Sequence, residues 1–172
     1  MYVIRMVFFV AMILSTAVAF AVEQFPSDCR PIVVTEEPLI LSTEKPMLVM
    51  MHNLSNSDLW ITHPVVEPSV NAGWSTRLEA DHWSALVLRE KKFELSCIES
   101  KPGHEQQVPC SDVLAICQWE SLQIPQHLVG TFWAGENKTL STLSAYLGRR
   151  GFVKNTPGYD KKQDTNSPRQ ND

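Results

Sequence analysis

The chain lacks the long apolar and basic segments that mark membrane-spanning and nucleic-acid-binding proteins. After Phe20 no apolar run approaches the roughly 20 residues with which a helix crosses a bilayer. The 15 Lys and Arg residues against 19 Asp and Glu residues give a formal net charge of −4, and no long basic cluster is present. A mildly acidic chain of this kind argues against nucleic acid as a partner.

Cysteine is scarce, and its spacing matches no common metal site. The sequence contains neither a C-x-x-C nor an H-x-x-x-H pattern, so it is a poor match to zinc. A blue-copper loop needs a Cys followed closely by His and then Met. All six methionines lie at or before Met51, so none follows Cys97 or Cys117. We therefore predict neither a metal site nor a cofactor, although five scattered histidines are present: His52, His63, His82, His104 and His127.

The motifs of nucleophilic catalysis are also missing. There is no G-x-S-x-G elbow. Asp81 stands beside His82, but neighbours along a strand point to opposite faces and are badly placed to act as a dyad. Glu36 and Glu37 precede Pro38, which is typical of a solvated turn. The sequence thus predicts no catalytic residues and a protein that is not an enzyme.

The N-terminus, by contrast, has the pattern of an export signal. Arg5 precedes an apolar run from Met6 to Phe20, and small residues at Ala17, Ala19 and Ala21 provide A-x-A cleavage patterns. We predict a cleavable signal peptide over residues 1–21, with no stable membrane insertion after cleavage. The expected location is the periplasm, and secretion is the alternative.

Four cysteines in an exported chain of this size predict two disulfides. If the strands around Cys97 and Cys117 pair about a midpoint near residue 107, these two cysteines lie opposite each other, which leaves Cys110 for Cys29. The other two connectivities remain open, and one of them closes a small loop between Cys110 and Cys117.

The region from Ile32 to Trp119 has the texture of β-structure. Short β-branched, aliphatic and aromatic runs alternate with turns rich in Pro, Asn, Ser and Gly. This spacing predicts a mainly β fold, a Greek-key β-sandwich of the immunoglobulin- or cupredoxin-like kind, in one domain over residues 22–153. The expected strands cover 32–35, 39–42, 47–52, 59–62, 75–80, 82–88, 93–100 and 113–120, with a last short one over 130–134.

One short C-terminal helix is expected over about residues 137–148. Leucines recur there every three or four positions, Thr139 or Asn137 can cap the start, and Gly148 is expected to end it. The polar residues 154–172 predict a disordered tail.

Five tryptophans are many for a domain of this size, and most are expected in the core. Trp60 lies between the polar residues Asp58 and Thr62, on the opposite strand face from Leu59 and Ile61. Trp74 follows a glycine turn. These two are therefore predicted to be exposed and to mark a possible binding surface.

Four blocks of the sequence together carry a family resemblance. They are Cys29-Arg30-Pro31, 53–64 with Leu-Trp-Ile-Thr-His, 93–119 with Phe-Glu-Leu-Ser-Cys and Ile-Cys-Gln-Trp, and 139–152 ending in Leu-Gly-Arg-Arg-Gly-Phe. These blocks resemble the enhanced entry protein EnhB family of intracellular bacterial pathogens, over nearly the whole predicted mature chain and without a catalytic motif. The resemblance implies a periplasmic protein linked to host-cell entry or intracellular survival, acting beside companion Enh proteins, and it implies no functional residues.

The sequence therefore favours a non-enzymatic protein–protein interaction module of the bacterial envelope. Its expected partners are envelope proteins or companion Enh proteins. The alternative is a metal-binding, cupredoxin-like protein without a blue-copper loop, suggested by the sandwich pattern and the five histidines.

Overall fold

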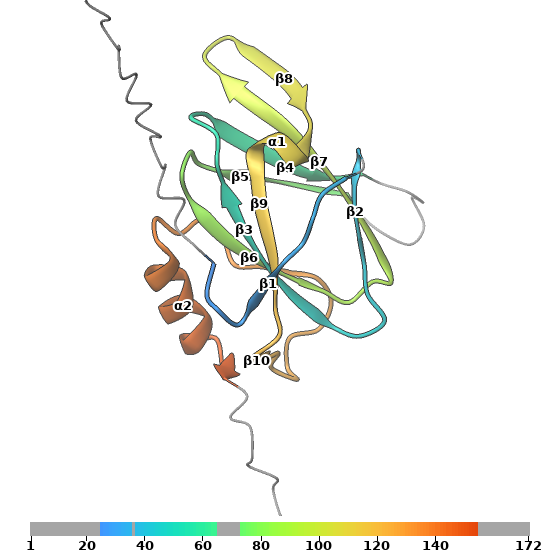
Figure 1. Ribbon diagram of the computed structural model, residues 1–172, viewed down its shortest axis with the longest axis vertical. Coiled ribbons are helices and arrows are strands. Elements are labelled where there is room, and N and C mark those ends of the chain that lie inside the picture. The colour runs from blue at the N-terminus through green and yellow to red at the C-terminus, as the bar shows by residue number, and fades with distance from the viewer. Residues whose placement is uncertain (1–24, 36, 65–72, 155–172) are drawn as a thin grey trace, which may run out of the picture.

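Two antiparallel sheets packed face to face form the body of the protein (Figure 1). The computed structural model describes residues 25–35, 37–64 and 73–154. The first sheet has the strand order β1-β9-β3-β6-β11, and the second has the order β2-β7-β4-β5, with β8 paired to β7. The predicted β-sandwich is confirmed. The strands are β1 Cys29–Pro31, β2 Leu39–Ser42, β3 Met47–Asn53, β4 Asp58–His63, β5 Trp74–Leu78, β6 Trp83–Leu88, β7 Lys92–Lys101, β8 His104–Val108, β9 Leu114–Trp119, β10 Leu122–Gln123, β11 Phe132–Trp133 and β12 Val153–Lys154; the helices are α1 Cys110–Val113 and α2 Leu140–Arg149.

The main core lies between the two sheets. Alternate residues of β4 and β7 point into it, as the alternating burial of Leu59, Ile61, Phe93 and Leu95 shows. Strands β3 and β6 contribute the facing side chains from the first sheet. The chain passes from one sheet to the other several times, for example between β3 and β4 and between β6 and β7, so both layers are built from strands that lie far apart in the sequence.

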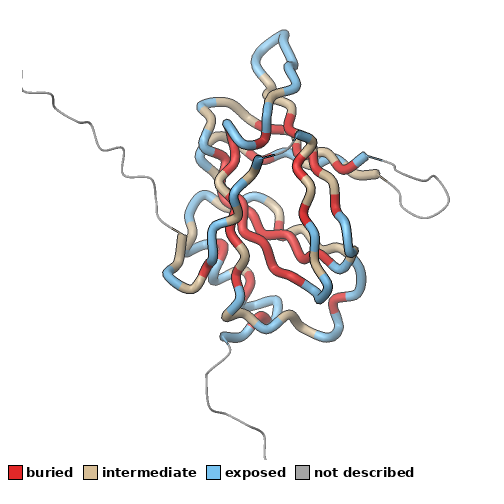
Figure 2. Tube along the Cα trace, turned by 45° about the vertical axis from the view of Figure 1, so that its right-hand side comes forward, coloured by how far each residue is buried: buried red, intermediate tan, exposed pale blue. Residues whose placement is uncertain are grey.

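A third layer covers the outer face of the first sheet. Every residue of β3 and β6 is buried (Figure 2), because one face of these strands meets the second sheet and the other meets α2. Leu143 and Leu147 of α2 pack there with Trp83 and Trp119. The near-continuous apolar character of β3 and β6 therefore reflects burial on both faces.

Part of the segment between the strands expected over 93–100 and 113–120 belongs to a hairpin. Strand β7 continues to Lys101, the chain turns at Gly103 with φ +73°, and β8 returns beside β7. Figure 1 shows this hairpin extending beyond the sandwich. Because β8 is polar and largely exposed, it lacks the apolar alternation by which the other strands could be predicted. At the other end of the domain, the strand expected over 32–35 is also wrong, since pairing of β1 with β9 ends at Pro31.

The two predicted disulfides exist, but the predicted pairing is wrong. Cys29 forms a disulfide with Cys117, with a Cα–Cα distance of 5.6 Å. Cys97 forms the other disulfide with Cys110, with a Cα–Cα distance of 5.3 Å. The prediction paired β7 with β9, whereas these strands belong to different sheets. The hairpin brings Val108 opposite Cys97, which places Cys110 close by, and β1 lies directly beside β9. Two disulfides are typical of proteins that fold in an oxidising, extracytoplasmic compartment.

The C-terminal helix begins at Leu140, three residues later than expected, and ends at Arg149. Thr139 is the N-cap of α2, but Gly148 lies within the helix and the chain leaves it at Gly151, where φ is +89°. Lys154, the first residue of the predicted tail, belongs to β12 and pairs with Leu122. The predicted signal peptide and residues 155–172 lie outside the described residues. No helix in the described ranges is long and apolar enough to cross a membrane.

Candidate functional site

Local sequence signals define both ends of α2. The Thr139 side chain accepts a hydrogen bond from the backbone N–H of Thr142, whose side chain in turn accepts one from the N–H of Thr139. This reciprocal capping box satisfies two N–H groups that the helix itself leaves unpaired. At the other end Phe152 N–H donates to the Leu147 carbonyl and Gly151 N–H to the Gly148 carbonyl. This is a Schellman motif, and it brings Phe152 back against the first sheet beside Leu147.

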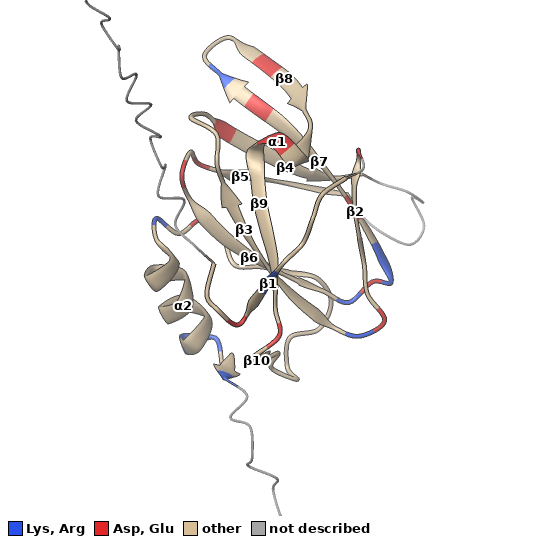
Figure 3. Cartoon of the chain, in the orientation of Figure 1, with Lys and Arg blue, Asp and Glu red and all other residues tan. Residues whose placement is uncertain are grey.

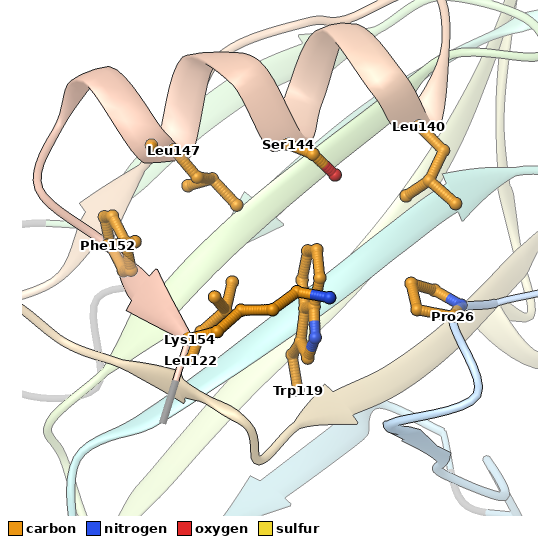
Figure 4. A pocket seen from close by; sticks show the side chains of 9 residues that line it. Pro26, Trp119, Leu122, Leu140, Ser144, Leu147, Phe152 and Lys154 are labelled. Atoms are coloured by element: carbon orange, nitrogen blue, oxygen red, sulfur yellow. The ribbon is translucent and has the colours of Figure 1, made fainter. Parts of the chain in front are cut away.

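A pocket of about 310 Å³ lies between α2 and the edge of the first sheet (Figure 4). The helix contributes one wall, and Trp119 of β9 lies opposite it. Small residues at Ser144 and Gly148, one helical turn apart, leave room that larger side chains would fill. We call this the α2 pocket. It is lined by Pro26, Trp119, Leu122, Leu140, Ser144, Leu147, Gly148, Phe152 and Lys154.

Three polar groups interrupt the apolar lining of the α2 pocket. The Ser144 hydroxyl points into it from the helix, and the Lys154 ammonium reaches across it near the ring of Trp119 (Figure 4). Trp119 is 4 % exposed, and its indole nitrogen is buried beside Asp28. The Ser144 and Lys154 groups can donate a hydrogen bond to a ligand, so the pocket is suited to an acceptor with an apolar body.

One carboxylate stands beside these donors. Asp28 lies 4.0 Å from the Lys154 Nζ and accepts a hydrogen bond from the Ser121 hydroxyl. That hydrogen bond, against the opposing effect of burial, holds the pKa of Asp28 below its usual value, and the nearby Trp119 indole lowers it further. The protein therefore stabilises a negative charge at this end of the pocket.

Charge is distributed unevenly over the fold. Between residues 137 and 154 the chain contains four basic residues and no acidic one. Acidic side chains instead occur on the β7–β8 hairpin and α1, at Glu99, Glu105 and Asp112 (Figure 3). The segment that contains α2 is thus basic on a protein whose net charge is negative, and Asp28 is an acidic neighbour of its last basic residue. The four basic residues are Lys138, Arg149, Arg150 and Lys154.

The two tryptophans predicted to mark a binding surface lie on opposite faces of the second sheet. Trp60 is half-buried on the outer face, where it pairs with Arg77 of β5. Trp74 is also half-buried, but it pairs with His63 and packs against the main core, so it lies on the inner face. Its ring is 5.7 Å from that of Trp133 on the edge strand β11. The two side chains therefore do not share one face, and a binding role for either stays a prediction.

The histidines are dispersed as structural side chains. His52 stacks on Trp83 with ring centroids 4.1 Å apart, and His63 stacks on Phe93 at the same separation. Asp81, which precedes His82 in the chain, instead contacts His52, with 3.0 Å between Oδ1 and Nε2. Both stacked histidines are buried, and neither lies in the α2 pocket.

No observation favours the metal-binding alternative. All four cysteines are in disulfides and are unavailable as thiolate ligands. Over residues 25–35, 37–64 and 73–154, no group of three or more His, Cys, Asp and Glu side chains is placed to hold an ion. The scattered histidines therefore give no support to a cupredoxin-like function.

Asn53 is a buried structural residue at the end of β3. Its amide group donates to the backbone carbonyls of Ser57, Leu78 and Glu79 at 2.9–3.0 Å, and its carbonyl oxygen accepts from Ser55. One side chain thus ties the β3–β4 turn to the end of β5. This explains how a fully buried amide is tolerated there.

Comparison with known proteins identifies no relative. No family model, no curated protein and no solved structure matches this chain. The resemblance to the EnhB family therefore stays a prediction, and the functional assignment depends on the chain's own sequence and structure.

Sequence reasoning missed the α2 pocket. The signal available was the spacing of Leu140, Ser144, Leu147 and Gly148, in which small residues interrupt the apolar face of the helix. This pattern shows that the helix surface is uneven, but not what lies opposite it. Pro26, Trp119 and Phe152 reach the site from separate parts of the chain.

Proposed function

We propose that this protein is a non-enzymatic binding protein of the bacterial periplasm that holds an envelope partner at the α2 pocket. Its disulfides and the predicted export signal support a location outside the cytoplasm. The link to host-cell entry or intracellular survival, and companion Enh proteins as partners, rest on the family resemblance alone.

The observation that carries the proposal is an open apolar pocket on a surface otherwise short of large exposed apolar side chains. Among the described residues such side chains are Val33, Leu54, Val129 and Val153. Most of the energy of a protein interface comes from a few apolar or aromatic anchors that insert into pockets. At about 310 Å³ the α2 pocket is at the small end of ligand sites, which suits one or two anchor side chains.

Site-specific photocrosslinking tests this proposal. A photoreactive amino acid at Ser144, an exposed residue that lines the pocket, is expected to capture a discrete partner in intact cells. The same group at Gln106, an exposed residue of β8 on the distant hairpin, is the matched control. Capture at both positions or at neither would contradict a partner site at the α2 pocket.

A pocket-filling variant provides the second arm. Ser144→Phe places a large side chain in the pocket from an exposed helical position, so we expect loss of the partner without loss of the fold. Ser144→Ala leaves the pocket open and is expected to retain the partner. Circular dichroism and thermal unfolding of both variants would show whether the fold is kept.

A further inference from the structure

The α2 pocket combines apolar walls with hydrogen-bond donors in its lining. Leu140, Leu147 and Phe152 form the walls, while the Ser144 hydroxyl and the Lys154 ammonium extend into the same space (Figure 4). The indole N–H of Trp119 is buried beside Asp28, whose pKa it lowers, so it is not presented to a ligand. An acceptor atom on the ligand can pair with Lys154 or Ser144, so the pocket favours ligands that bring one.

The charged residues around the α2 pocket determine whether a neutral or a negatively charged acceptor is favoured. Lys154 lines the pocket and is 72 % exposed in its side chain, so it can turn toward a ligand. Arg150 lies over the ring of Phe132, which in turn contacts Phe152 of the pocket wall. Two acidic groups stand nearby, Asp28 and Glu120, and the second is paired with Arg30 at 3.1 Å.

The Asp28 carboxylate shows that a negative charge is stable beside this pocket. Its carboxylate remains beside Lys154 and Trp119, even though burial alone would disfavour its charge. The contact with Lys154 is long, at 4.0 Å, and Asp28 keeps its hydrogen bond from Ser121. Lys154 is therefore available to a second carboxylate.

We propose that the α2 pocket recognises an apolar side chain that lies next to a carboxylate, so that the partner presents an acidic, apolar segment. This inference rests on the proposed function and names the chemistry of the partner. The apolar side chain enters between α2 and Trp119. The neighbouring carboxylate pairs with the Lys154 ammonium in a charge-assisted hydrogen bond, which is stronger than a neutral one.

Binding of defined peptides to the full, oxidised protein tests the inference. The probes are blocked hexapeptides with a central Phe-Leu pair flanked by aspartates, by asparagines or by lysines, with decanoate as a further probe. Aspartate and asparagine differ little in shape, so their comparison isolates charge. We expect the aspartate peptide to bind about fivefold more tightly than the asparagine peptide in isothermal titration calorimetry, and the lysine peptide to bind most weakly.

Two variants assign the preference to the pocket. Lys154→Gln is expected to remove the preference for aspartate, whereas Lys91→Gln, an exposed lysine in the turn between β6 and β7, keeps it. Ser144→Phe is expected to weaken all of the peptides, because it occupies the space for the apolar side chain. Raising the salt concentration is expected to reduce the preference.

The outcomes separate this inference from the proposed function. Equal binding of the aspartate and asparagine peptides, or an unchanged preference in Lys154→Gln, would overturn the carboxylate while leaving an apolar partner site. Binding of decanoate without binding of any peptide would replace the protein segment with an acyl chain and overturn the inference. Failure of every probe would also overturn it, and crosslinking at Ser144 would then decide separately whether the pocket holds a partner.

Discussion

Removing the two disulfides one at a time is expected to destabilise the protein by different amounts. Cys29–Cys117 spans 88 residues of sequence, and Cys97–Cys110 spans 13. A crosslink restricts the unfolded chain more when it closes a longer loop. From chain entropy, the double variant C29A/C117A should lose about 4.6 kcal/mol of unfolding free energy and C97A/C110A about 2.9 kcal/mol.

The comparison is informative because the surroundings of the two bonds are similar. Cys29 is 4 % exposed, and the other three cysteines are fully buried. Replacement by alanine therefore removes a similar amount of buried sulfur in each case and leaves no free thiol. The expected difference of about 1.7 kcal/mol then reports mainly on loop length.

Urea unfolding followed by tryptophan fluorescence measures this difference. With an m-value of about 2 kcal/mol/M, the midpoints of the two variants should differ by about 0.9 M urea. Peptide mapping without reduction would confirm the pairing itself. A larger loss in C97A/C110A, or a peptide that links Cys97 to Cys117, would refute the reasoning.

Four further substitutions test other parts of the structure. Asn53→Ala removes hydrogen bonds to three backbone carbonyls, one of them buried and two partly buried, and should cost about 2–4 kcal/mol in urea unfolding. Gly148→Ala should stabilise the protein by about 0.5–1 kcal/mol, since an added Cβ meets no atom within 4 Å, whereas Gly151→Ala should destabilise it by about 1 kcal/mol because φ is +89°. Ser121→Ala should remove the main cause of the low pKa of Asp28. A lowered folded-state pKa stabilises the protein above the unfolded value of 3.8, so the difference from the native protein should be present at pH 7 and disappear as the pH falls from about 5 to 2.

Each of these substitutions has a control or a contradicting result. Asn56→Ala, at an exposed position of the same turn, should change stability by less than about 0.5 kcal/mol. Equal losses at Asn53 and Asn56 would contradict the role assigned to the buried amide. The two glycine substitutions should change the free energy of unfolding in opposite directions. Destabilisation by Gly148→Ala would therefore mean that α2 does not extend past Gly148. A stability difference for Ser121→Ala that persists at pH 2 would exclude linkage to Asp28.

The placement of individual strands was predictable because their signals are local. Strand β2 covers 39–42 as expected, and β4 shows the alternation of Leu59 and Ile61 with polar neighbours. A strand with one buried face needs apolar residues at every second position, whatever strand lies beside it. The cap at Thr139 is local in the same sense, since its partner is three residues away.

Strand β8 shows where local signals fail. Its residues are polar and largely exposed, so they do not show the alternation of apolar and polar positions that marks a half-buried strand. It is held by the ladder with β7, from Cys97 opposite Val108 to Lys101 opposite His104. Backbone hydrogen bonds of this kind form with almost any side chains, so they are hard to predict from the sequence.

The amino-acid sequence by itself determined that this chain builds a mainly β domain with two disulfides and one capped helix. Periodicity, turn residues and an even number of cysteines are properties of neighbouring residues or of composition. Tertiary structure decided that Cys29 meets Cys117, that Trp74 faces the core, and that α2 leaves a pocket above Trp119. Each of these depends on which distant segments pack together, and a side chain carries its own polarity and shape but not the identity of the partner that covers it.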